Sequence, residues 1–189
     1  MSRPHTGAEP DPWRAPVIVA QIPDTGLYRE LEASAAERQA MAELAGLREI
    51  LSAKASFDVV PKSGGRYQVT GHVRARIGQT CVVTLDPIEN EIEEEVDLMF
   101  APEAEARRLA DLIEEGQDDE EPPEVADPPE AIVGGIIDLG RLATDALFLA
   151  IDPYPRKPGA VFEAEVTAPD PEDHPFAALK ALQDEKKGR

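Results

Sequence analysis

A single cysteine, few aromatic residues and the lack of a long apolar run limit what this chain can be. Cys81 is the only cysteine, so no disulfide can form within one chain and a reducing compartment is expected. The 189 residues include only 1 Trp, 3 Tyr and 5 Phe, which predicts a modest core. No segment reaches the roughly 18 consecutive apolar residues of a membrane span. The N-terminus carries Pro10 and Asp11 where a signal peptide needs an apolar run. We therefore expect a cytoplasmic protein without a membrane anchor.

The residue patterns of common catalytic and cofactor sites are also missing. His5 lies in a proline-rich N-terminus, His72 on the polar side of a predicted strand, and His174 in a segment of Pro and Asp. None of them stands at helical spacing from another strong metal ligand. The phosphate-binding, dinucleotide-binding and HExxH patterns do not occur. These absences predict a non-enzymatic binding protein with no cofactor and no metal.

Charge is abundant but unevenly distributed. The chain has 19 Lys and Arg against 38 Asp and Glu, a formal net charge of −19, and this average repels nucleic acid. Residues 50–80 nevertheless carry a local charge of +4, whereas residues 89–135 carry −16. The cations of the first window are Lys54, Lys62, Arg66, Arg74 and Arg76. Two interpretations stay open: a basic face that contacts RNA phosphates, or cross-strand pairing in which Arg74 or Arg76 faces Glu93 or Glu95.

Periodicity predicts most of the first hundred residues. An apolar run predicts a short strand over 17–22, and a capping box from Ser34 to Glu37 predicts a helix over 34–45. Period-two alternation then predicts strands over 51–59 and 67–77, joined by a turn at 63–65. We expect a third strand at 81–85 and a fourth at 92–100. These four runs predict an antiparallel sheet with one wet face.

The second half of the chain begins with a low-complexity stretch of Glu, Asp, Pro and Ala over about 101–135. Its composition predicts an acidic disordered arm, with a short helix over 104–114. Asp138 is a predicted N-cap for a helix that ends near residue 150. A short strand over 161–166 and a small amphipathic helix from Pro175 to about residue 182 are expected near the C-terminus.

Together these elements predict one α+β domain: a small antiparallel sheet or partly open barrel packed by two or three helices, with the acidic arm between its halves. The predicted division is a disordered N-terminus (1–16), a sheet-rich half (17–100), the arm (101–135), a helical half (136–182) and a tail (183–189). Cys81 is expected to be a small buried apolar residue, because free cysteine is usually that.

Three blocks of this sequence resemble the YceD family of bacterial and plastid proteins. The first spans 71–75 and 79–87, the second runs from Ile137 to Pro155, and the third is Pro175 to Leu179. Order and spacing agree over about 50–182. The single cysteine followed by Tyr154-Pro155-Arg156 is similar to alphaproteobacterial members. The motif positions are Gly71, Cys81, Thr84, Leu85, Pro87, Asp138, Leu139, Pro153, Pro155, Pro175 and Phe176.

The resemblance implies a role in the accumulation or maturation of large-subunit ribosomal RNA, with no known catalytic residues. Many members carry a Cys-x-x-Cys pair, which suggests metal binding. In this chain Thr84 stands at the position of the second cysteine, and a hydroxyl is a poor zinc ligand.

Two hypotheses follow for how such a protein acts. In the first, it contacts ribosomal RNA through Lys54, Lys62, Arg66, Arg74 and Arg76. In the second, it is an adaptor whose acidic arm docks on a basic ribosomal or assembly protein without touching RNA. A redox role for Cys81 is a third, weaker hypothesis.

Overall fold

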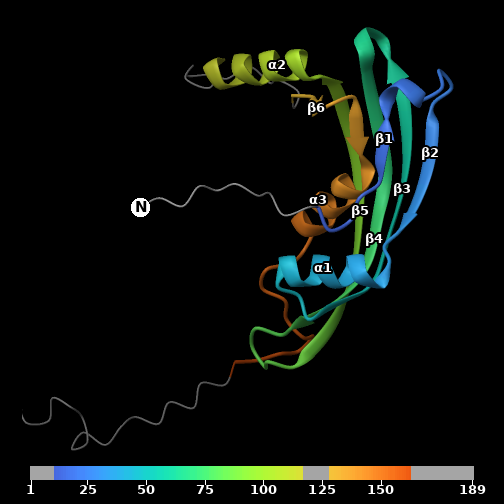
Figure 1. Cartoon of the computed structure of the whole chain (residues 1–189). Helices are drawn as coiled ribbons and strands as arrows, with labels where there is room; N and C mark the ends of the chain where they lie inside the picture. The colour runs from blue at the N-terminus through green and yellow to red at the C-terminus, as the bar shows by residue number, and fades with distance from the viewer. Residues whose placement is uncertain (1–10, 117–127, 163–189) are drawn as a thin grey trace, which may run out of the picture.

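A long, curved sheet dominates the computed structural model, which describes residues 11–116 and 128–162 (Figure 1). Its strand order is β2-β3-β4-β5-β6. The strands are β2 (Leu27–Glu32), β3 (Glu49–Lys62), β4 (Arg66–Thr80), β5 (Pro87–Pro102) and β6 (Glu130–Ile132). Pairing is antiparallel from β2 to β5, whereas β6 runs parallel to β5. The α+β class is confirmed, but the sheet is mixed and not wholly antiparallel.

A second, two-stranded sheet joins a segment near the N-terminus to the segment just before α3 (Leu139–Leu149). β1 (Pro16–Ile18) pairs antiparallel with β7 (Ile136–Asp138). The predicted strand over 17–22 therefore stops at Ile18, and a 3-10 helix, η1 (Val19–Gln21), follows it. Periodicity did not predict β2, β6 or β7. The strands β6 and β7 are only three residues long, which is too short to show a period.

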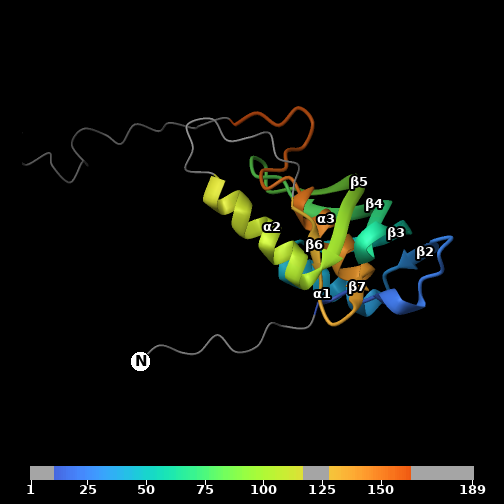
Figure 2. The same ribbon diagram turned by 90° about the horizontal axis from the view of Figure 1, so that it is seen from above.

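Two helices cover one face of the large sheet, and a third extends away from it (Figures 1 and 2). α1 (Ala35–Ala45) begins at the predicted capping box and ends at Gly46, whose φ of 66° suits glycine. α3 (Leu139–Leu149) begins at Asp138, the predicted N-cap. α2 (Glu103–Gly116) follows β5 directly and covers the helix predicted over 104–114. We call the sheet face without helices the outer face.

The core lies between the large sheet and the helices α1 and α3. Alternation buries Phe57, Val69 and Val73 completely, together with Met41 from α1 and Leu147 from α3. This is the inward set that period-two reading predicts for β3 and β4. A register shift between Ile50 and Ser52 changes the start of β3, so Ile50 is buried at 5% exposure instead of the predicted Leu51.

The described part of the proline-rich N-terminus is ordered, contrary to the prediction for residues 1–16. Trp13 is only 2% exposed and belongs to the core cluster. The backbone of this segment lies against α3, and a Cβ at Gly140 would stand 2.6 Å from the carbonyl oxygen of Trp13. Composition predicted disorder because it contains no information on the burial of the Trp13 indole or on the close contact between this backbone and Gly140.

Residues 81–85 form a turn and not the predicted strand. β4 continues through Gly78 and Gln79 to Thr80, and the chain then turns back so that β5 starts at Pro87. Within the predicted arm the structure describes α2 and β6, while residues 117–127 lie outside the described residues. The helix predicted at 175–182 and most of the strand predicted at 161–166 also lie outside them.

Candidate functional site

The five cations of the basic window lie along the outer face, and three of them stand opposite acidic neighbours on the next strand. In the strand register Arg74 pairs with Glu93, Arg76 with Glu91, and Lys54 with Glu32. Lys62 and Arg66 face each other where η2 (Ser63–Gly65) joins β3 to β4. Antiparallel pairing thus places the basic window and the acidic window side by side.

Four of the five cations form ion pairs. Arg74 donates to Glu93 from Nε at 2.9 Å, and Arg76 donates to Glu89 from Nε at 2.8 Å. Lys54 lies 3.4 Å from Glu32, and Arg66 pairs with Glu105 of α2. Lys62 forms no ion pair within 11–116 and 128–162. Cross-strand pairing, one of the two interpretations left open by the sequence, is therefore the arrangement that Lys54, Arg74 and Arg76 adopt.

The outer face as a whole is acidic. Every second residue of β5 from Glu89 to Asp97 is an acid on this face, and β2 and β3 add Glu30, Glu32 and Asp58. The cations on this face are Lys54, Lys62, Arg66, Arg74 and Arg76, so eight acids stand against five bases. The local charge of +4 read along the sequence is consequently not a basic patch in space.

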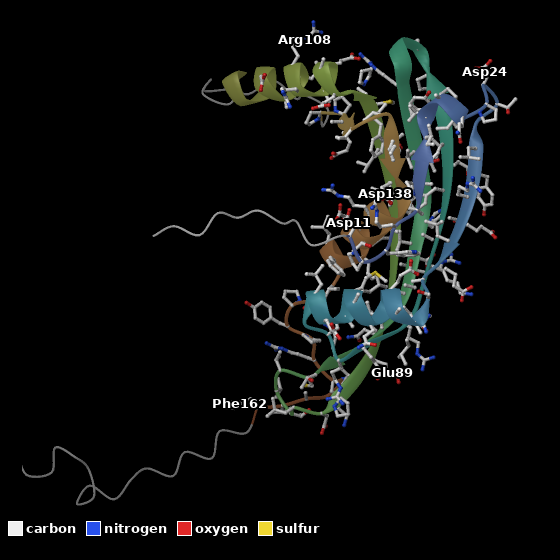
Figure 3. The ribbon with its side chains drawn as sticks, viewed as in Figure 1. Asp11, Asp24, Glu89, Arg108, Asp138 and Phe162 are labelled. Carbon is white, nitrogen blue, oxygen red and sulfur yellow. The ribbon has the colours of Figure 1, made fainter. Side chains whose placement is uncertain are left out.

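A groove of about 1060 Å³ lies between β5, β6, β7 and α3. We call it the acidic groove. Seven acidic residues and two arginines line it. The acidic residues are Asp11, Glu94, Glu95, Asp97, Glu130, Asp138 and Asp145. Strand alternation directs the side chains of Glu95 and Asp97 to the outer face, so the other five contribute carboxylates to the groove. Figure 3 shows Asp11 and Asp138 together on the side of the sheet that carries the helices.

Both arginines of the acidic groove are already engaged. Arg14 lies 3.3 Å from Asp138, and Arg141 lies 3.6 Å from Asp145. The other three groove carboxylates, those of Asp11, Glu94 and Glu130, form no ion pair within the part of the chain that the structure describes. The groove therefore carries a negative potential that a cationic ligand would neutralise.

The floor of the acidic groove is apolar. Leu142, Ala146 and Phe148 of α3 and Leu98 and Phe100 of β5 line it while remaining partly exposed. At its rim Leu149 is 88% exposed and Val133 is 64% exposed. Apolar side chains left in the open beside unpaired acids are typical of a surface that binds a protein segment.

A second cluster brings together family-motif positions that are far apart in the sequence. The turn at 81–86 packs against residues 152–157: Val82 donates its N–H to the carbonyl of Pro155 at 2.9 Å, and Lys157 pairs with Asp86 at 3.0 Å. Cys81, Thr84, Leu85, Pro87, Pro153 and Pro155 thus belong to one structural unit. The sequence named these positions but did not predict that they meet.

Cys81 is fully buried at the centre of this unit, as expected. The backbone N–H groups of Lys157 and Thr84 donate to its Sγ at 3.3 and 3.4 Å. These donors, that of Lys157 first, lower the pKa of the Cys81 thiol to about 6. Within the described residues no three His, Cys, Asp or Glu side chains lie close enough to hold a metal ion.

The remaining motif positions have structural places. Gly71 lies on β4 directly under Phe57, and a Cβ there would stand 2.1 Å from the carbonyl oxygen of Ser56. Asp138 caps α3, and Leu139 is fully buried. Pro175 and Phe176 lie outside the described residues.

The chain matches the family model described as "Large ribosomal RNA subunit accumulation protein YceD" over residues 69–183, more than half of its length. The chain belongs to the YceD family. The match covers both the turn at 81–86 and the segment that packs on it, and also β5 and α3 beside the acidic groove. The predicted family assignment is confirmed. No curated protein and no solved structure matches this YceD chain. Among the helices of the described residues, none is long and apolar enough to span a bilayer.

Sequence reasoning did not find the acidic groove of this YceD protein. One signal was present: β5 alternates acids on the outer face with apolar residues on the inner face, but Glu94 interrupts the inner set. An exposed acid among the apolar residues on the core side of a strand indicates a hollow beside it, and Glu94, between the buried Ile92 and Val96, does line the groove.

Proposed function

We propose that this YceD protein supports the accumulation of large-subunit ribosomal RNA by docking a basic ribosomal or assembly protein in the acidic groove, without catalysing a reaction. The observation that carries the proposal is the charge of the groove, where the carboxylates of Asp11, Glu94 and Glu130, which form no ion pair within the described residues, lie beside an apolar floor. Ribosomal proteins that bind RNA are rich in Lys and Arg, so they have the complementary charge. Bacterial ribosomes are assembled in the cytoplasm, which is where we place this chain.

The same structure argues against the RNA-contact hypothesis for the five cations. Arg66, Arg74 and Arg76 already donate to carboxylates, and these neighbouring acids would repel a phosphate that approached the same guanidinium groups. Phosphate binding also requires a surface of net positive potential, because it depends on release of counterions from RNA. The outer face has the opposite sign.

The sequence suggested the acidic arm as the surface that docks a partner. In this proposal the acidic groove has that role instead. Of the arm's acids, Glu130 lines the groove on β6. Deletion of 117–127 therefore separates the two versions. If the arm is the docking surface, the deletion abolishes partner binding, whereas the acidic groove predicts that binding persists.

The proposal is tested in cells in which the only copy of the chain is a variant. We expect Glu94→Lys with Glu130→Lys to lower the ratio of large- to small-subunit ribosomal RNA, because both side chains line the groove and both are exposed. The contrasting variant is Arg74→Gln with Arg76→Gln, which removes two cations of the outer face and leaves the side chains of the groove unchanged. An unchanged ratio in the groove variant, with a lowered ratio in the arginine variant, would show that RNA contact is the function.

A further inference from the structure

The strand that borders the acidic groove has an open edge. From Pro87 to Met99 the only strand paired with β5 within the described residues is β4. β6 covers the other edge only from Phe100 to Pro102. A strand of this length spans about 40 Å, and its free edge presents a row of backbone N–H and C=O groups.

The side chains along this edge follow a strict charge pattern on the outer face. Glu89, Glu91, Glu93, Glu95 and Asp97 occupy five consecutive outward positions. Arg76 and Arg74 neutralise Glu89 and Glu93 from β4. Glu91, Glu95 and Asp97 have no such partner within residues 11–116 and 128–162. A strand added to this edge would therefore be stabilised by Lys or Arg at its outward positions, since opposite charges attract across strands.

The inner face at the same edge is apolar apart from Glu94. Residues of the added strand that point inward would lie over the groove, beside Leu98 of β5 and the partly exposed Leu142 of α3. Leu149, which is 88% exposed, stands at the far side of this floor. A ligand that fits both faces alternates basic and apolar residues in an extended conformation.

Two other occupants are disfavoured by charge. A second copy of this chain, paired edge to edge through β5, would place acids opposite acids, an arrangement that natural sheets use to prevent such pairing. The chain's own residues 161–167, Val-Phe-Glu-Ala-Glu-Val-Thr, alternate in the right way but carry acids and no base. A basic segment of a different protein remains.

We propose that β5 binds an extended segment with alternating basic and apolar residues by β-strand addition, and that this segment extends the sheet while its apolar side chains fill the acidic groove. This inference rests on the proposed function and specifies how its partner binds. Main-chain hydrogen bonds would supply affinity and the alternation would supply specificity, as in other strand-addition complexes.

The test uses the full-length protein and a fluorescent peptide of about eleven residues that alternates Lys with Val or Leu. A scrambled peptide of the same composition is the control for charge and hydrophobicity. We expect the scrambled peptide to bind on the order of tenfold more weakly, because it cannot match both faces of one strand. Equal affinities would overturn the inference.

Backbone methylation separates strand addition from simple attraction. Two further peptides carry N-methyl groups either at every Lys or at every apolar position, so that each loses the donors of one strand edge. Strand addition predicts that one of the two loses binding while the other retains it, and the identity of the inactive one gives the strand direction. Retained binding by both peptides would contradict strand addition.

The site on the protein is located with matched charge reversals at the two sheet edges. Glu91→Lys with Glu95→Lys should weaken the alternating peptide on the order of tenfold, whereas Glu30→Lys with Glu32→Lys on β2, the opposite edge, should not. Hydrogen exchange of amides in β5 should slow on binding. Removal of residues 163–189 should leave the affinity unchanged, and a rise in affinity would identify that segment as the resident occupant and overturn the assignment.

This inference and the proposed function can fail separately. If the alternating peptide fails to bind but Glu94→Lys with Glu130→Lys still lowers the ratio of ribosomal RNAs, the groove docks its partner in another way. If the peptide binds as expected but the groove variant leaves the ratio unchanged, strand addition stands and the proposed cellular role does not.

Discussion

The Sγ atom of Cys81 accepts a hydrogen bond from the backbone N–H of Lys157 at 3.3 Å, across 76 residues of sequence. Lys157 also reaches Asp86 on the same turn, where its Nζ lies 3.0 Å from the carboxylate and lowers the pKa of Asp86. One residue of the segment that follows α3 therefore fixes both ends of the turn between β4 and β5. The buried thiol is the centre of this junction, and its ionisation must affect stability.

The first prediction concerns pH. Because the folded state lowers the pKa of Cys81 from about 9 to about 6, ionisation stabilises the fold. This contribution is complete above the pKa of the unfolded thiol and is lost as the pH falls towards 6. The free energy of unfolding should therefore rise between pH 6 and 9 more steeply in the natural protein than in Cys81→Ser. Urea unfolding of both proteins measures this, and parallel pH profiles would contradict it.

The second prediction concerns Gly71. A Cβ at this position would stand 2.1 Å from the carbonyl oxygen of Ser56 and 2.5 Å from the ring of Phe57, so β3 and β4 must separate to admit it. Gly71→Ala should cost about 1–3 kcal/mol of unfolding free energy, the usual range for overpacking. Thr70→Ala, the outward neighbour on the same strand, is the control and should change stability by less than about 0.5 kcal/mol. Similar losses in both variants would disprove the packing argument.

The third prediction uses the single tryptophan as a reporter. Asp138 Oδ1 accepts from the N–H groups of Gly140 and Ala15 at 3.1 and 2.8 Å, so it caps α3 and holds the segment that buries Trp13. Asp138→Ala should cost about 1–2 kcal/mol and shift Trp13 fluorescence to longer wavelength. Asp138→Asn keeps an acceptor oxygen and should lose far less. An unshifted spectrum in Asp138→Ala would mean that the core alone holds Trp13.

The elements that local sequence determines were the ones that could be predicted. The capping box at Ser34 and the N-cap at Asp138 satisfy backbone donors within their own helices, so the pattern alone specifies α1 and α3. Period-two alternation specified β3 and β4, because a strand with one buried face shows this pattern in its own sequence.

The errors occurred where contacts distant in sequence decide the structure. Residues 81–85, Cys-Val-Val-Thr-Leu, have strong strand propensity, yet the contacts with Pro155 and Lys157 hold them in a turn. Trp13 is buried although its neighbours are mostly polar or proline. The charges of the two windows were counted correctly, but the β4–β5 register places Arg74 against Glu93, so the cations of the basic window face acids in space. The same register creates the acidic edge that we propose as the docking strand.

The fourth prediction separates stability from function at Leu85. Leu85 is the one non-glycine residue with positive φ in the described chain, at 61°, and its side chain is 75% exposed. A left-handed conformation costs a residue with a branched side chain roughly 1–2 kcal/mol, whereas Asn tolerates it. Leu85→Asn should therefore raise the free energy of unfolding by up to about 1 kcal/mol, and Val82→Asn in the same turn should give no such gain.

A strained, exposed apolar residue persists where something other than folding favours it. If Leu85 contacts a partner, Leu85→Asn will be more stable than the natural protein and yet will lower the ratio of large- to small-subunit ribosomal RNA. A variant that gains stability and keeps the ratio would show that Leu85 has no role in binding. A variant that gains no stability would show that the contacts of the turn with residues 152–157 impose the conformation without strain.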